Sequence, residues 1–256
     1  DWDAVIDRYE KILLDMDNTV SVRHNPGAGK TIHQVMPVYA SGDAISRQAL
    51  LIREYLLQKG YKSDIFTCHI EPGENTANRF HPDCLWDADS VIYHHSIGTE
   101  LLDFIQRHQG PKALIYHNVT PAHYFAHDPQ FASYLKEGRL ALKTLARHLD
   151  TGYGDSAYNA GELKQAGFKH TGVLPIVVDP AVWNTPPDSQ LMDTLQGGDT
   201  HLIFVGRIAP NKCQHHLIEA FVRYLDLDPG AKLHLVGKAL PDDAYYHHLL
   251  ALILKY

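Results

Sequence analysis

The chain has 256 residues, of which 45% are hydrophobic and 21% charged; this excludes a disordered chain and allows one large or two smaller globular domains. The net charge of -7 comes without a long acidic or basic run, so the charge pattern does not indicate a nucleic-acid partner. Cys68, Cys84 and Cys213 lack paired spacing, so we expect reduced thiols. The sequence shows neither a signal peptide nor an apolar run of membrane length, so we expect a cytoplasmic protein, with peripheral attachment to a membrane left open.

Predicted helices and strands alternate through the first part of the chain. Helical spacing of apolar side chains predicts an amphipathic helix over residues 3–16. Predicted strands, rich in apolar residues, occupy residues 31–39, 63–68, 90–94, 112–117 and 172–178. Four predicted helices lie between these strands: one that ends at Gly60, one over 101–106, one over 131–149 and one that contains 162–165. This alternation predicts an α/β fold with a doubly wound parallel sheet and right-handed crossovers.

The composition changes at residue 179. Residues 179–200 are polar, contain several prolines and glycines and lack sustained periodicity, so we expect a linker after an N-terminal domain of residues 1–178. The pattern then restarts with predicted strands over 202–205 and 233–236, each followed by a helix. Two strands are fewer than the roughly six of a Rossmann-like domain. We therefore interpret residues 201–256 as the first part of such a domain, truncated at Tyr256, and the chain as an incomplete, inactive portion of an enzyme.

The loop after the predicted strand 202–205 carries two cationic side chains, Arg207 and Lys212, and Asn211 is the expected N-cap of the next helix. Helix-terminal N–H groups, a guanidinium and an ammonium together suit a diphosphate, and the mouth of a parallel sheet is where such ligands bind. The loop therefore predicts an anion site. Two ordinary surface cations remain an open alternative.

Five segments carry a family resemblance: GDAIS at 42–46, YHNVTP at 116–121, SAYNAGEL at 156–163, VLPIVVDPAVW at 173–183 and FVGRIAPNKCQHHLIEAF at 204–221. Their content, order and spacing resemble the retaining glycosyltransferases of family 4, which have the GT-B fold. The resemblance implies two facing Rossmann-like domains, a nucleotide sugar held mainly by the C-terminal domain and an acceptor held mainly by the N-terminal domain. It also implies catalysis without a metal ion or cofactor, in bacterial surface-polysaccharide or lipopolysaccharide biosynthesis.

The resemblance also implies roles for single residues. Arg207 and Lys212 match the basic pair that neutralises the leaving diphosphate. Gly42 matches a glycine that lets backbone N–H groups approach the donor phosphate. His117 matches a catalytic histidine that lies beside the transferred sugar.

Each of these assignments in the N-terminal domain has a structural alternative. Gly42 could be an ordinary turn glycine, and His117 a packed histidine at a strand end. Asp43 and Asn118 are candidates for contact with donor or acceptor, but for Asp43 the favoured role is to cap the following helix.

The chain departs from the family pattern in three places. Cys213 stands where many relatives carry glycine, and Ile176-Val177 stands where they carry Asn-Gly. No glutamate follows Glu219, so the pair of glutamates that binds the donor sugar and ribose in relatives would lie beyond Tyr256.

Two other kinds of site were weighed. KILLDMDNTV, at residues 11–20, resembles the nucleophile motif of haloacid dehalogenase-like phosphatases, with Asp15 as nucleophile and Asp17 as acid–base, but helical spacing argues against the strand this requires. His117, His123 and His127 lack a nearby acidic ligand, so we expect no metal site there.

The sequence thus predicts a hexosyltransferase that uses a nucleotide diphosphate sugar and a carbohydrate or lipid-linked saccharide acceptor, with retention of configuration. The alternatives are the phosphatase and a non-catalytic acceptor-binding or scaffolding fragment.

Overall fold

The structure is a computed structural model that describes residues 29–256 except 41, 82, 84–87 and 179–183. It divides into two compact units, Asp1–Val178 (unit 1) and Asp179–Tyr256 (unit 2), and each is described by itself. The helix expected over residues 3–16 and the phosphatase-like motif at 11–20 lie outside the described residues. No helix in the described part of the chain has both the length and the apolar character needed to cross a lipid bilayer.

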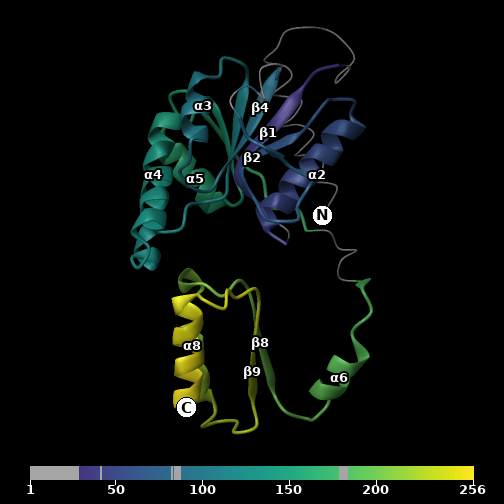
Figure 1. Cartoon of the computed structure of the whole chain (residues 1–256), viewed down its shortest axis with the longest axis vertical. Coiled ribbons are helices and arrows are strands. Elements are labelled where there is room, and N and C mark those ends of the chain that lie inside the picture. Colours follow the sequence, from purple (N-terminus) through teal and green to yellow (C-terminus); the bar gives the residue numbers. More distant parts are fainter. Residues whose placement is uncertain (1–28, 41, 82, 84–87, 179–183) are drawn as a thin grey trace. The chain divides into compact units, whose positions relative to one another are not determined.

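Unit 1 is built on one seven-stranded sheet in which every neighbouring pair is parallel (Figure 1). The spatial order is β3-β2-β1-β4-β5-β6-β7. Strands β1 to β3 therefore extend the sheet in one direction and β4 to β7 in the other, and the switch point lies between the neighbours β1 and β4. The strands are β1 Ile32–Tyr39, β2 Ile65–Ile70, β3 Asn78–Arg79, β4 Ser90–His95, β5 Lys112–Tyr116, β6 Thr151–Gly154 and β7 His170–Val173. Since all strands run the same way, their carboxyl ends share one edge, which is where ligands bind in open α/β sheets.

Helices cover both faces of this sheet (Figure 1). One face carries α2, Ala44–Gln58, and the other carries α3, Leu101–Arg107, α4, Pro129–Leu145, and α5, Ala157–Ala166. A short 3-10 helix, η2, covers Ala122–Phe125. The α/β fold with a doubly wound parallel sheet is therefore confirmed.

The alternation of side chains along each strand produces a separate hydrophobic core on each face. Tyr93 and Leu114 lie in the core under α3, α4 and α5, whereas their neighbours Ile92 and Ile115 lie in the core under α2. Fully burying one such aliphatic side chain contributes about 1.5–3 kcal/mol. Strands buried on both faces explain why the sequence shows continuous apolar runs.

Helix α4 contacts the loop after β4 through its backbone. Gly98 N donates to the carbonyl of Tyr134, at 3.0 Å, and His95 Nε2 lies 2.8 Å from the carbonyl of Gly138 in the middle of the helix. A Cβ atom on Gly138 would lie 2.6 Å from the backbone nitrogen of Gly98. Glycine at position 138 is therefore required by packing, although it lies inside a helix.

We predict that Gly138→Ala destabilises unit 1 by about 1–3 kcal/mol, because the added methyl group forces backbone atoms apart. Gly161, inside α5, is the matched control, since nothing lies within 4 Å of a Cβ atom there. Gly161→Ala should stabilise the protein by about 0.5–1 kcal/mol through better helix propensity. Urea unfolding of both variants checks the pair, and equal effects at the two positions would contradict the packing argument.

Unit 2 contains one parallel pair of strands, β8 (His201–Val205) and β9 (Lys232–Val236). Its helices are α6, Ser189–Leu195, the 3-10 helix η4, Pro210–Lys212, α7, Gln214–Tyr224, and α8, Ala244–Lys255. The small core joins Ile208, Ile218, Tyr245 and Leu249. Ile203 and Val205 on β8 are 68% and 72% exposed, so one face of this strand has little cover within the described residues.

Three predictions about elements need correction. The strand expected over 172–178 is wrong after its first two residues, because β7 runs from His170 to Val173. The strand β6 was not anticipated, since Gly152 and Gly154 make up half of its four residues. A Cβ atom on Gly154 would lie 2.5 Å from Ala160 N, so close packing of α5 selects glycine there. Residues 179–200, expected to be a linker, contain the helix α6, whose N-cap is Asp188.

Candidate functional site

The carboxyl edge of the sheet in unit 1 brings together the residues predicted from the sequence. Register pairs His95 with Tyr116 and Tyr116 with Gly154, so the residues that follow β5 and β6 are level with the end of β4. His117, Asn118 and Asp155 therefore lie at one edge, as does the loop after β1 that contains Gly42.

The loop after β1 has an open glycine followed by a helix cap. Gly42 has φ 74°, a left-handed conformation that favours glycine, and no heavy atom lies within 4 Å of where a Cβ would be. Asp43 is the N-cap of α2, since its Oδ2 accepts from Ser46 N at 3.0 Å. The structure thus gives Asp43 the capping role favoured above, and it leaves space beside Gly42.

Four polar side chains form a continuous hydrogen-bonded chain on the α2 side of the sheet, which we call the histidine network. It consists of Gln34 on β1, His94 on β4, His117 after β5 and Asp155 after β6. His94 Nε2 lies 2.9 Å from Gln34 Oε1, and His94 Nδ1 lies 3.0 Å from His117 Nε2. His117 Nδ1 lies 2.9 Å from Asp155 Oδ2. The rings of His94 and His117 are stacked, with an interplanar angle of 2°.

The network places the predicted catalytic histidine inside unit 1. The side chain of His117 is only 1% exposed within the described residues, and both of its ring nitrogens have partners. Asp155 Oδ1 is buried and has no hydrogen-bond partner among the described residues. His117 therefore has no vacant ring nitrogen with which to accept a proton.

His95, next to His94 but on the opposite face of the sheet, is also buried. Its Nδ1 lies 2.9 Å from the Tyr93 hydroxyl, and its Nε2 faces the Gly138 carbonyl. Burial lowers the pKa of His95 to about 4, and burial together with the neighbouring His117 holds the pKa of His94 well below its ordinary value. Both imidazoles are consequently neutral at pH 7.

This burial predicts a defined loss of stability in acid. Between the ordinary histidine pKa of 6.5 and about 4, the unfolded chain binds a proton at His95 that the folded chain does not bind. Stability therefore falls as pH falls through that window, by on the order of 3 kcal/mol for this group. In His95→Gln the fall should be smaller by that amount. Denaturant unfolding across the window measures the difference, and parallel curves for the two proteins would contradict it.

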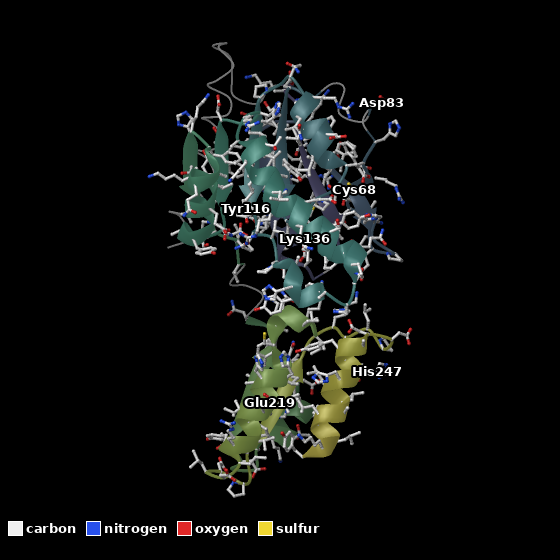
Figure 2. The ribbon with its side chains drawn as sticks, turned by 90° about the vertical axis from the view of Figure 1, so that its left-hand side faces the viewer. Cys68, Asp83, Tyr116, Lys136, Glu219 and His247 are labelled. Carbon is white, nitrogen blue, oxygen red and sulfur yellow. The ribbon has the colours of Figure 1, made fainter. Side chains whose placement is uncertain are left out.

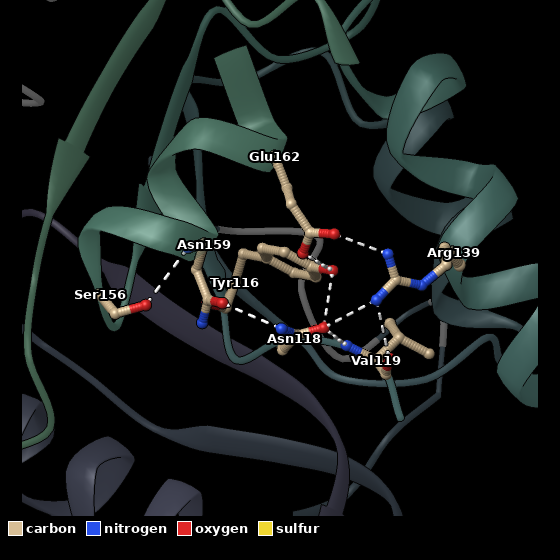
Figure 3. Close-up of polar contacts among 7 residues, drawn as sticks. All are labelled: Tyr116, Asn118, Val119, Arg139, Ser156, Asn159 and Glu162. Carbon is tan, nitrogen blue, oxygen red and sulfur yellow. Dashed lines mark hydrogen bonds and ion pairs between the residues drawn. The ribbon is translucent and has the colours of Figure 1, made fainter. Parts of the chain in front are cut away.

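A second polar network fills the α4 and α5 side of the same edge (Figure 3). Arg139 of α4 donates to Glu162 Oε1 at 2.6 Å and to the side-chain oxygen of Asn118 at 3.1 Å. The Tyr116 hydroxyl donates to Glu162 Oε2, and Asn118 Nδ2 donates to Asn159 Oδ1. Burial, reinforced by Glu162, raises the pKa of Tyr116. We call these five residues the Arg139 network.

The Arg139 network holds Asn118 in an unusual backbone conformation. Asn118 has φ 67°, one of two positive values among the described non-glycine residues. Such a conformation costs about 1–2 kcal/mol, and asparagine tolerates it better than most residues. Because its side-chain amide is fully engaged, Asn118 offers mainly its backbone to a ligand.

In unit 2, the loop between β8 and α7 carries the predicted anion-binding residues. Arg207 and Lys212 are exposed, and within the described part of the chain neither side chain has a hydrogen-bond or ion-pair partner. The prediction of Asn211 as N-cap is wrong: Asn211 lies in η4, and Cys213 precedes the first residue of α7. Cys213 makes no side-chain cap, but the Tyr245 hydroxyl accepts from His215 N at 3.3 Å in the first turn of α7.

Cys213 explains one departure from the family pattern. It has φ 55° and ψ 35°, the left-handed conformation that glycine adopts without strain. The position where many relatives carry glycine is therefore one where glycine is favoured physically. The loop keeps this path with cysteine present, and Gln214 supports it by donating from Nε2 to the carbonyl of Arg207 at 2.9 Å.

Three other sequence observations have simple outcomes. His117, His123 and His127 do not gather, and no group of three or more histidine, cysteine or acidic side chains suited to a metal lies within the described residues. Glu219, the last glutamate of the chain, lies on the exposed surface of α7 (Figure 2). Cys68 and Cys213 are free thiols, and burial raises the pKa of Cys68 to about 12.

Sequence reasoning did not identify His94 or Asp155 as site residues. His94 ends a predicted strand, which is a weak signal, and Asp155 follows the strand β6 that the glycines concealed. Recognising β6 would have placed Asp155 at the same sheet edge as His117.

The chain is similar to solved structures of glycosyltransferases with the GT-B fold. Sucrose-phosphate synthase from Thermosynechococcus elongatus shares 14% identity and a TM-score of 0.57, over 89% of this chain and 68% of that one. An alpha,alpha-trehalose 6-phosphate synthase from Burkholderia multivorans shares 12% identity and a TM-score of 0.57, over 88% and 69%. An alpha-glucosyltransferase in complex with UDP-glucose and DNA containing an abasic site shares 12% identity and a TM-score of 0.56, over 88% and 60%.

No protein-family model and no curated protein sequence matches the chain. At the identities of the solved structures, the likeness establishes the fold alone. The GT-B-like fold class predicted from the sequence is thus confirmed.

Proposed function

We propose that the protein is a retaining glycosyltransferase of family 4, of the surface-polysaccharide type. It transfers a hexose from a nucleotide diphosphate sugar to a carbohydrate or lipid-linked saccharide acceptor. The GT-B-like fold supports this proposal, because the similar solved structures are of glycosyltransferases. The observation that carries it is the loop of unit 2, where Arg207 and Lys212, whose side chains have no partner among the described residues, precede the start of α7.

The chemistry of that loop suits a diphosphate. A guanidinium binds two phosphate oxygens at once, an ammonium adds a mobile charge, and the first N–H groups of a helix point at an anion. Arg207 and Lys212 supply the cations, and they carry most of this role. In the first turn of α7, His215 N already donates to the Tyr245 hydroxyl at 3.3 Å and His216 N to the Cys213 carbonyl at 3.0 Å. In the proposed reaction this loop stabilises the negative charge on the leaving diphosphate.

The remaining steps need little from the protein. The bond between the anomeric carbon and the diphosphate oxygen breaks, and an acceptor hydroxyl attacks the same face of the oxocarbenium-like centre. The proton of that hydroxyl passes to the leaving phosphate. His117 has no role as a base in this proposal, because both of its ring nitrogens have partners; it supports the sheet edge beside which the sugar would lie. Gly42 leaves room for close approach of the donor.

The proposal includes no metal and no cofactor, because Arg207 and Lys212 take the neutralising role at the diphosphate. It does not fix the acceptor. The names of the similar structures include synthases of sucrose phosphate and trehalose 6-phosphate and an enzyme bound to DNA, so one fold serves different acceptors. A cytoplasmic location, with peripheral attachment at the inner face of the cell membrane, belongs to the same proposal.

The phosphatase alternative is not favoured. Asp15 and Asp17 lie outside the described residues, and the similar solved structures have a different activity.

We predict that Arg207→Ala raises the Kd for nucleoside diphosphate by about tenfold to a hundredfold, because it removes charge-assisted hydrogen bonds. The matched control is Arg223→Ala, which removes an exposed arginine from the last turn of α7, at the end of the helix far from the loop, and should leave the Kd unchanged. Calorimetric titration of the 256-residue chain with UDP, ADP and GDP measures both. Repeating the titration in EDTA tests independence from metal.

Equal Kd values for the two arginine variants would contradict the assignment of the loop. Failure of the wild-type chain to bind any of the three nucleotides would contradict the proposed donor class.

We also predict that Gly42→Val weakens the binding of a nucleotide sugar, because a β-branched side chain fills the space beside the loop. Gly29 is the matched control, since it too has a positive φ, 83°, and an open Cβ position, but it precedes β1 at the opposite end of the strand. Gly29→Val should carry a similar backbone strain without affecting binding. Melting temperatures of the two variants measure the backbone strain, and titration with the nucleotide sugar measures the affinity. If Gly42→Val and Gly29→Val lost the same affinity, Gly42 would be an ordinary turn glycine.

A further inference from the structure

The peptide group that follows Arg207 is held on both of its edges. The Arg207 carbonyl accepts from Gln214 Nε2 at 2.9 Å, and the N–H of Ile208, in the same peptide group, donates to the Lys238 carbonyl at 3.0 Å. A peptide group is planar, and its C=O and N–H point in opposite directions. The two hydrogen bonds therefore fix the orientation of the whole group.

The peptide group that precedes Arg207 is held by close packing. A Cβ atom on Gly237 would lie 1.9 Å from the Gly206 oxygen and 3.3 Å from Arg207 N, so Gly237 lies directly against this group. The Gly206 N–H, one peptide earlier, donates to the Val236 carbonyl at 2.9 Å. The two peptide groups beside an α-carbon determine the direction of its Cα–Cβ bond. The direction in which the Arg207 side chain leaves the backbone is thus fixed.

The donor of this arrangement, Gln214, is itself fixed. It is the first residue of α7, and its side chain is fully buried. The next residue, His215, is tied to α8 by the Tyr245 hydroxyl, which accepts from His215 N at 3.3 Å and lies 2.8 Å from His215 Nδ1. A buried side chain on an anchored helix start has lost its rotamer freedom before a ligand binds, so its bond to Arg207 is preorganised.

The amide of Gln214 makes one hydrogen bond among the described residues, and that bond acts on Arg207. Its Nε2 faces a carbonyl, which only accepts, so the amide cannot be turned round. Its Oε1 is buried without a partner among the described residues. An unpaired buried acceptor does not stabilise the fold, so an apolar side chain of the same length would serve packing equally well.

We propose that Gln214 is a positioning residue for the anion site: it fixes the direction in which Arg207 presents its guanidinium, and so sets the affinity of the loop for a diphosphate. The inference deepens the function proposed above and rests on it for the identity of the ligand. An exposed arginine loses conformational freedom when it binds an anion, and a backbone that is already fixed reduces that loss.

The first test needs no nucleotide. Gln214→Met keeps the length and helix propensity of the side chain but removes the donor. In this variant the Ile208 amide should exchange its hydrogen about tenfold faster, because its peptide group is then held on one edge only. The Gly206 amide, which donates to the Val236 carbonyl, should keep its rate. Hydrogen exchange of the 256-residue chain, followed by NMR, measures both amides.

Unchanged rates in Gln214→Met, or equal acceleration at the two amides, would overturn the proposal. The wild-type chain decides the question even if the variant fails to fold. Its Ile208 amide should be protected as strongly as its Gly206 amide, and rapid exchange at Ile208 alone would show that this peptide group is not fixed.

The second test is calorimetric titration with UDP. Gln214→Met should raise the Kd about threefold to tenfold, which corresponds to one hydrogen bond. Its melting temperature should change little, because the variant loses a hydrogen bond and an unpaired acceptor together. Ile218→Val is the matched control: Ile218 lies one turn further along α7, in the core of unit 2. It should lower the melting temperature and keep the Kd.

A double variant tests whether Gln214 acts through Arg207. Arg207→Ala combined with Gln214→Met should bind UDP no more weakly than Arg207→Ala alone, since the side chain to be positioned is already absent. A further loss of affinity in the double variant would overturn the route through Arg207. A rise in Kd in Ile218→Val as large as that in Gln214→Met would overturn the positioning role, because it would assign the effect to stability.

The two kinds of measurement separate this inference from the proposed function. A wild-type chain that binds no nucleotide would contradict the proposed function, and the exchange rates would still decide whether Gln214 holds Arg207. Nucleotide binding that is lost in Arg207→Ala but unchanged in Gln214→Met would keep the proposed function and overturn this inference.

Discussion

The constraint on which unit 1 depends is that every strand pair in its seven-stranded sheet is parallel. Each connection returns the chain to the same end, so polar residues that follow different strands meet at one edge. The faces of the sheet are covered by helices, and the strands themselves are apolar. The buried polar side chains at the edge, His94 and His117 among them, are consequently shielded from water and depend on one another for hydrogen bonds.

They do so separately on the two faces. On the α2 side, Gln34, His94, His117 and Asp155 form a linear chain that crosses from β1 to the end of β6. On the other side, Arg139 and Glu162 hold the loop after β5 through Asn118. The consecutive residues His117 and Asn118 are thus fixed from opposite faces. A low local dielectric strengthens both sets of hydrogen bonds and makes any unpaired member costly.

Much of the fold followed from hydrophobic periodicity. The strands contain continuous apolar runs at Val35 to Tyr39, Val91 to Tyr93 and Ala113 to Tyr116, and α2 and α4 show clear helical faces. The strand β6 was concealed because close packing against α5 selects glycine, which has no strand signature of its own. The start of α7 was misjudged because a left-handed cysteine, rather than a capping side chain, ends the preceding turn.

The candidate site divides in the same way. Motifs that follow two strand ends identified Gly42 and His117, but no motif indicated the residues that surround them. The pairing of His94 with His117 depends on which strands are neighbours, and that order is a tertiary fact that no local pattern contains.

The order of the strands also has a kinetic consequence. The start of β1 is fastened to the start of β4 by a hydrogen bond from Thr31 N to Asp89 Oδ2, across 58 residues of sequence. Closing so long a loop costs more entropy than pairing β4 with β5, which follow each other directly. During synthesis on the ribosome, one edge of β1 therefore stays open until β4 has emerged. Until then, this apolar strand is the part of unit 1 most exposed to aggregation.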